Sequence, residues 1–180
     1  MRTWIDSAIT LLCAGDRSRR HNAVRNWLHK LADLAMLNPR LEQNCLNDGT
    51  KSRPADVYID SFTNGRPLAV DTTVFTPFSP HLVSNAAVKP LHTASEAEKI
   101  KRAKYEAACD QRGIKFVPFA VETTGGLGKV ALDLAKDLLG RVSKRFNQPF
   151  PTVAHYYYQQ LSVSLQRQVA RSVVDRIEQL

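Results

Sequence analysis

The sequence predicts an α/β fold in which a mixed sheet is flanked by helices. Helical apolar patterns occur near both ends of the chain, two alternating segments joined by Asn64-Gly65 lie between them, and one apolar strand separates two further helical patterns. The chain has 180 residues, of which 43% are hydrophobic, and this is enough to build one domain around a core.

The first half of the chain is predicted to form a helix followed by three strands. Apolar residues recur at i, i+3 and i+4 over 21–37, and Asn38-Pro39 ends that helix. A short apolar stretch over 41–46 is interpreted as a strand, and a polar loop over 47–53 with an Asp48-Gly49 turn follows it. The alternating segments 55–60 and 68–75 then form a hairpin, because Asn-Gly between such runs is a strong turn signal.

The second half adds helices and one strand. Residues 76–93 contain three prolines and no periodicity, which predicts a long loop. A helix over 94–112, a strand over 114–121, a helix over 127–146 and a last helix after Pro149 and Pro151 follow. We expect an N-terminal extension over 1–19, a core over 20–146, and a C-terminal helix over 147–180 that packs on the core.

Two carboxylates stand out on the predicted hairpin. A two-residue turn places Tyr58 opposite Asp71 and Asp56 opposite Thr73, so that all four side chains share one face. The two aspartates are then diagonal neighbours, with Cα atoms ~7–8 Å apart. They either hold a hard cation such as Mg²⁺ or are solvated or paired with Arg or Lys. The opposite face, which carries Val57, Ile59, Val70, Thr72 and Val74, is predicted to face the core.

The charge of the chain favours a polyanionic partner. Lys and Arg total 25 against 17 Asp and Glu, which gives a net charge of +8. On the helix over 94–112, Lys101 and Lys104 lie on one flank near its buried face, where either is placed to supply a cation to a phosphodiester reaction. A plain solvated face is the alternative for both, and it is the preferred interpretation for Lys99 and Arg102.

Several segments resemble the PD-(D/E)XK nucleases, and among them the endonuclease domains at the C-terminal end of some non-LTR retrotransposon polyproteins and their domesticated relatives. The similar stretches span residues 20–126, and the order of elements is similar to the αβββαβ core of the restriction-endonuclease-like fold. They are Arg20-His21-Asn22 and the segments 53–57, 69–74, 101–105 and 116–126.

The resemblance implies a set of site residues. Asp56 and Asp71 would be the metal ligands, and Lys101 or Lys104 the catalytic lysine. The DNA-binding residues would be Arg20, His21, Lys104 and Tyr105, although packing is an alternative for Tyr105. The family's third motif normally ends in lysine, whereas Thr73 stands there in this chain. The lysine has therefore moved to the helix, or the site is impaired.

The function implied by the resemblance is an Mg²⁺- or Mn²⁺-dependent endonuclease that hydrolyses DNA phosphodiester bonds. A catalytically inactive DNA-binding or scaffold module with the same fold is the first alternative, and an interaction domain unrelated to nucleic acid is the second. DNA is the expected partner, together with a second copy of the chain or a parent polyprotein.

The cysteines and the N-terminus indicate the setting of the chain. Cys13, Cys45 and Cys109 are odd in number and far apart in sequence, which favours a reducing intracellular compartment, nuclear in a eukaryote. The chain lacks a signal-peptide pattern and a run of about 18 apolar residues, so no membrane is expected. Residues 6–13 resemble an eroded zinc-knuckle tail, so we predict no zinc and a natural start upstream of Met1.

Two glutamates have more than one interpretation. Glu42 is either an additional acidic residue of the nuclease site or a surface glutamate, and the surface position is preferred. Glu122 follows the last strand and precedes a glycine turn, where it either touches the metal side of the site or caps the helix over 127–146. Capping is the preferred role.

Overall fold

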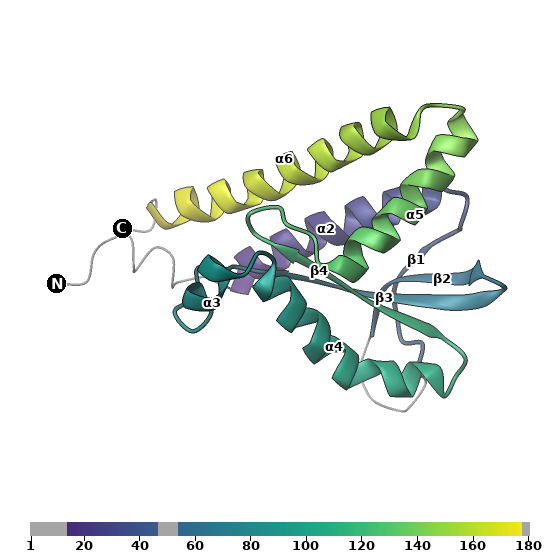
Figure 1. The fold of residues 1–180 in the computed structure, drawn as a ribbon, viewed down its shortest axis with the longest axis horizontal. Helices are drawn as coiled ribbons and strands as arrows, with labels where there is room; N and C mark the ends of the chain where they lie inside the picture. Colours follow the sequence, from purple (N-terminus) through teal and green to yellow (C-terminus); the bar gives the residue numbers. More distant parts are fainter. Residues whose placement is uncertain (1–13, 47–53, 178–180) are drawn as a thin grey trace.

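The structure, a computed structural model, describes residues 14–46 and 54–177. Figure 1 shows the arrangement of its elements. The helices are α2 (Ala14–Leu34), α3 (Val83–Val88), α4 (His92–Asp110), α5 (Lys129–Phe146) and α6 (Phe150–Ile177), and the strands are β1 (Arg40–Gln43), β2 (Ala55–Thr63), β3 (Arg66–Phe75) and β4 (Lys115–Glu122).

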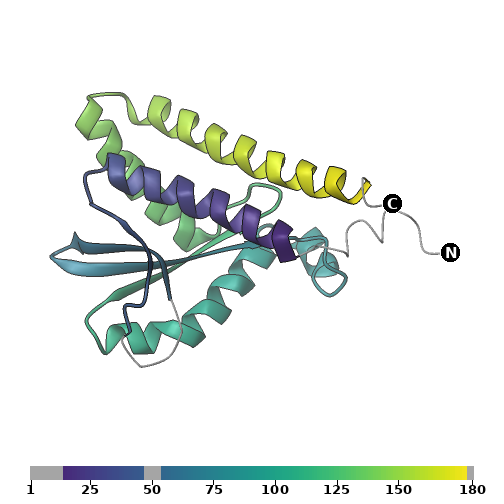
Figure 2. The same ribbon diagram turned by 180° about the vertical axis from the view of Figure 1, so that it is seen from behind.

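A mixed sheet lies between two layers of helix, as the sequence predicts. The strand order is β1-β2-β3-β4, with antiparallel pairs except for β3 and β4, which are parallel. Helix α4 lies on one face of the sheet, and α2, α5 and α6 lie on the other (Figures 1 and 2). The parallel pair requires a crossover from β3 to β4, and α4 forms this crossover.

The main core lies between the sheet and the layer of three helices. The predicted inward residues Val57, Ile59 and Val70 are at most 1% exposed and pack there with Phe119 of β4. A smaller cluster on the other face includes Ala69, Phe116 and Cys109. Alternate residues of each strand thus enter different cores, which explains the period-2 pattern of the sequence.

Helix α6 packs on the core through its first half. Leu161 and Leu165 are buried, and Trp27 of α2 donates a hydrogen bond through Nε1 to the Tyr157 carbonyl at 2.8 Å. The apolar i+4 series continues to Ile177, which is 65% exposed. A strict i+4 series turns steadily around a helix of 3.6 residues per turn, so its later members leave the buried face.

The register of the hairpin differs from the prediction. Asn64 and Gly65 form the turn with positive φ angles of 54° and 74°, and Thr63 faces Arg66 as expected. An irregularity between Ile59 and Thr63 then shifts the pairing, so Tyr58 faces Ala69 instead of Asp71. The shift is by two residues, which keeps every side chain on its predicted face.

Two other boundaries differ from the predictions. The predicted loop over 76–93 contains α3, a six-residue helix with no buried residue and therefore no apolar periodicity to detect. Helix α2 begins at Ala14, ahead of the predicted start at His21 and inside the segment expected to be an extension. Its first turns carry arginines instead of an apolar stripe, and arginine is a good helix former.

Buried glutamates cap two helices from neighbouring elements. Glu122 accepts a hydrogen bond from the Ala94 backbone N–H at 3.3 Å, so it caps α4. The sequence had predicted that it caps the following helix, α5, and this prediction is wrong. Helix α5 is capped by Glu98 of α4, whose Oε1 accepts a bond from the Val130 N–H at 3.1 Å. These two hydrogen bonds connect α4 to the end of β4 and to the start of α5.

Cys45 and Cys109 meet in the fold, although they are far apart in the sequence. Both belong to the smaller core cluster. A hydrogen bond between the thiols lowers the pKa of Cys45 and raises that of Cys109. Cys13, the zinc-knuckle-like residues 6–13 and the Asp48-Gly49 turn lie outside the described residues. Among the described helices, none has the length and apolar character needed to cross a membrane.

Candidate active site

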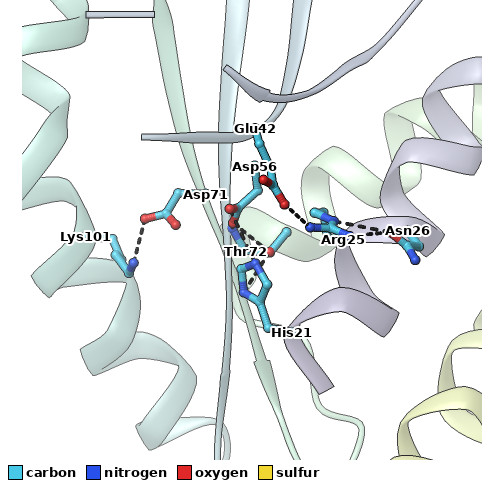
Figure 3. A network of polar contacts seen from close by, with 8 residues as sticks. All are labelled: His21, Arg25, Asn26, Glu42, Asp56, Asp71, Thr72 and Lys101. Atoms are coloured by element: carbon cyan, nitrogen blue, oxygen red, sulfur yellow. Dashed lines mark hydrogen bonds and ion pairs between the residues drawn. The ribbon is translucent and has the colours of Figure 1, made fainter. Parts of the chain in front are cut away.

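The two hairpin aspartates lie side by side at the end of the β2–β3 pairing. Val57 pairs with Val70 at this end of the hairpin, and Asp56 and Asp71 are the next residues along the two strands. Figure 3 shows the two carboxylates next to each other, with Asp71 turned toward α4 and Asp56 turned toward α2. The shifted register therefore brings them closer than the predicted diagonal placement.

Asp71 forms an ion pair with one of the two lysines predicted from sequence. Lys101 Nζ lies 2.8 Å from Asp71 Oδ2. The Asp71 side chain is 7% exposed and that of Lys101 is 26% exposed. A cation on α4 thus reaches a carboxylate on the central strand β3 (Figure 3).

The pKa of Asp71 is displaced toward neutrality. Burial raises it to about 6, because desolvation disfavours the charged form. The Lys101 charge opposes this rise, while the negative charge of Asp56 adds to it. A carboxyl group with such a pKa in a cleft is a mark of functional sites, because ordinary surface carboxylates titrate near pH 4.

Asp56 is held from two sides. Its Oδ2 accepts hydrogen bonds from the Thr72 backbone N–H at 2.6 Å and from the Thr72 hydroxyl at 2.8 Å. Its Oδ1 lies 3.4 Å from His21 Nε2, and His21 Nδ1 lies 3.3 Å from the same hydroxyl. The β3 backbone and the first turns of α2 therefore fix this carboxylate in orientation (Figure 3).

The pairing of His21 and Asp56 shifts both groups toward their charged forms. The hydrogen bond to Asp56 raises the pKa of His21 above its usual value, against the effect of burial. Burial alone would raise the pKa of Asp56, but the His21 and Thr72 contacts outweigh it and leave that pKa lowered. The adjacent carboxylates thus have pKa values displaced in opposite directions by their surroundings.

Glu42 lies at the edge of the same site. It forms an ion pair with Arg25 of α2, and its backbone φ is 53°, which is uncommon for a residue with a Cβ. Its side chain is 47% exposed, in keeping with the surface position preferred from sequence, yet it also lines the cleft described next. Backbone strain of this kind often accompanies functional sites.

A cleft of about 720 Å³ is lined by Asp71, Thr72, His21 and Glu42, whereas Asp56 lies outside its lining. Its walls come from the first turns of α2, from β3 and from residues 76–82, and Lys101 closes one side. Its basic lining residues are Arg17, Arg20, His21, Arg25, His81 and Lys101, and its acidic ones are Glu42 and Asp71. Arg20 is 3% exposed, and Arg17 lies at the surface. Cations therefore surround a small acidic centre.

The other lysine and the tyrosine predicted for the site lie apart from the cleft lining. Lys104 Nζ lies 4.7 Å from the centroid of the Tyr105 ring, and the hydrogen bond to Tyr105 raises the pKa of that lysine. Tyr105 packs against Phe116, with 5.7 Å between ring centroids. This is the packing role left open in the sequence analysis. Lys99 pairs with Glu96 at the surface.

Thr72 and Arg25 are site residues that sequence reasoning missed. Thr72 was expected to face the core, and it is 1% exposed, yet its hydroxyl and N–H both hold Asp56. The available signal was a hydroxyl among the core-facing β-branched residues of one strand, because a buried hydroxyl requires a partner. Arg25 had no such signal, since its role depends on where β1 packs.

The donor set at this centre consists of two carboxylates. In the described part of the chain, no group of three or more His, Cys, Asp or Glu side chains is arranged to hold a metal ion. Magnesium usually takes one or two carboxylates and completes its shell with water and substrate phosphate. Asp56 and Asp71 therefore fit Mg²⁺ or Mn²⁺ bound together with a phosphate, rather than a closed metal site formed by protein alone.

A comparison with models of known protein families found no match for this chain, and a comparison with characterised protein sequences found no significant one.

Proposed function

We propose that the chain is a magnesium-dependent endonuclease domain with a restriction-endonuclease-like core, acting on DNA phosphodiester bonds. The observation that carries the proposal is the Asp71–Lys101 ion pair, which lies next to Asp56 and lines a cleft together with several basic side chains. The order α2, β1–β3, α3, α4, β4 and the mixed sheet support it, with α3 as a short addition before the crossover helix α4. So does the net charge of +8, which suits a polyanionic substrate.

Each side chain has a role in this proposal. Asp56 and Asp71 hold the metal, which when bound supplies an activated water and a positive charge on the phosphate oxygens. His21 and Thr72 orient Asp56, so that its carboxylate needs no rearrangement. Lys101 replaces the lysine missing at Thr73 and presents a positive charge to the negative charge that grows in the transition state. Arg17, the exposed arginine of the cleft, contacts the DNA backbone, whereas Arg20 is 3% exposed and is therefore not available for the DNA contact expected from the sequence.

A nicking assay on supercoiled plasmid tests the activity. We expect cleavage with Mg²⁺ and none with the chelator EDTA, and we expect Asp71→Asn and Asp56→Asn to abolish cleavage. If the wild type binds DNA but never cleaves it, the chain is the inactive DNA-binding alternative. If it does not bind DNA at low salt, the nucleic-acid function is wrong.

The lysine assignment has a matched control on the same helix. Lys101→Met should slow cleavage by about 10²–10³ fold with little change in DNA affinity, because a preorganised charge acts mainly on the transition state. Lys99→Met removes a lysine two positions away that pairs with Glu96 and is 67% exposed. It should cleave at the wild-type rate. Equal rates for both variants would remove Lys101 from the mechanism, and Lys104→Met would then test the other candidate.

Metal binding is measured separately by calorimetric titration with Mn²⁺. Asp71→Asn should lose binding, whereas Asp60→Asn, an exposed change on the same hairpin, should retain it. Binding that persists in both variants would place the metal elsewhere. The assay needs no DNA, so it reports on the site even for a catalytically inactive chain.

A further inference from the structure

A second hollow, distinct from the active-site cleft, lies beside α3. It measures about 510 Å³, within the ~300–1,000 Å³ typical of small-ligand pockets. Apolar side chains dominate its lining, among them Phe78, Val83 and Leu91, and Thr124 with Glu122 contributes polar groups. Residues 77–91 thus form most of an apolar pocket, while Thr76, Ser79, His81 and Leu82 of the same segment line the cleft.

The segment around the pocket exposes apolar side chains to an unusual degree. Phe78 is 52% exposed, Val83 42% and Val88 86%, and α3 has no buried residue. Clustered exposed apolar groups usually mark a binding surface, because their exposure to water costs free energy that binding of a partner recovers. Phe78 therefore lines the apolar pocket while half of it is exposed, and neighbouring residues of its chain segment line the basic cleft.

The charge of the segment indicates what kind of partner it approaches. Between Asp71 and Glu96 the sequence contains no acidic residue, and it contains His81, Lys89 and His92. Glu122, which lines the pocket, is 6% exposed and belongs to β4, so the exposed part of residues 72–95 carries no acidic side chain and is compatible with a polyanion running across it. The pocket itself cannot receive a phosphate, since burying that charge among apolar groups is costly.

We propose that this pocket binds a single unpaired nucleobase, with Phe78 as the stacking surface. A base has an apolar planar face and polar edges, which match an aromatic ring with a hydroxyl from Thr124 nearby. Bases in an intact duplex are stacked and inaccessible to a pocket, so DNA with unpaired bases is the preferred ligand. This inference rests on the proposed nuclease function, because it takes the cleft to hold the adjoining phosphates.

Fluorescence anisotropy with two labelled probes tests the proposal. One probe is a forked duplex with unpaired arms, and the other is a fully paired duplex of the same length. Both are measured at the same salt concentration. The wild type should prefer the fork, and Phe78→Ala should weaken fork binding by about tenfold, in line with ~1–3 kcal/mol per stacked base. Its affinity for the paired duplex should not change, and Phe78→Tyr should restore fork binding.

Phe146→Ala is the matched control. Phe146 is 47% exposed at the end of α5, on the side of the molecule opposite α3 (Figures 1 and 2). It should bind both probes as the wild type does. Equal wild-type affinity for the two probes, or an equal loss on both in Phe78→Ala, would overturn the base pocket while leaving the nuclease function intact. Absence of binding to either probe would overturn both proposals.

Discussion

Replacing Asp71 by asparagine should stabilise the folded chain, and the gain should grow with pH. Burial raises the pKa of Asp71 from its ordinary 3.8 to about 6. The folded chain therefore binds the Asp71 proton more tightly than the unfolded chain does. As pH rises through this window, ionisation costs the folded state more, and the free energy of unfolding of the wild type falls relative to that of a neutral variant.

The size of the effect follows from the displacement of the pKa. One pKa unit corresponds to about 1.4 kcal/mol, so the gain at full ionisation is about 3 kcal/mol. At pH 5, between the two pKa values, the same linkage gives about 1.5 kcal/mol. The attraction of Lys101 is already included, because that ion pair lowers the same pKa. The side chain is 7% exposed, so solvent screens little of this energy.

Urea unfolding followed by circular dichroism at pH 5 and pH 8 measures the difference. Asp71→Asn should exceed the wild type by about twice as much at pH 8 as at pH 5. Asp60→Asn is the control, since Asp60 forms an exposed ion pair with Arg40, and it should change stability by at most ~1 kcal/mol at either pH. A variant whose gain is the same at both pH values, or which is less stable at pH 8, would refute the assignment of a buried and destabilised carboxylate.

Two further predictions test the packing around α4. A Cβ at Gly128 would lie 2.2 Å from Glu98 Oε1, so Gly128→Ala should displace the cap of α5 and lower the free energy of unfolding by about 1–2 kcal/mol. At Gly140 the added Cβ has nothing within 4 Å. Gly140→Ala should therefore raise the free energy of unfolding by up to ~1 kcal/mol in the same urea experiment. In a Cys13→Ser variant, mild oxidation should form a disulfide between Cys45 and Cys109. Peptide mass spectrometry measures this disulfide. If the two thiols remain unlinked after oxidation, they are not in contact.

The local patterns of the sequence determined the elements and the faces of the hairpin. Alternation in β2 and β3, the Asn64-Gly65 turn and the helical apolar stripes each depend on residues a few positions apart, so they can be recognised without the fold. Asp56 and Asp71 lie on the same face although the predicted register was wrong, because a slip of two residues preserves the face on which each side chain lies. The short helix α3 escaped detection because none of its residues is buried.

The tertiary structure alone decided how the carboxylates are surrounded. Lys101 and Lys104 are equivalent on a helical pattern, and the angle at which α4 crosses β3 brings Lys101 to Asp71. Contacts of His21 with Asp56, of Arg25 with Glu42 and between the two thiols likewise join distant parts of the chain. Such contacts depend on how whole elements pack, and no short-range pattern encodes them. The displaced pKa of Asp71 has the same origin, since desolvation exists only once α4 and the sheet have closed around the carboxylate.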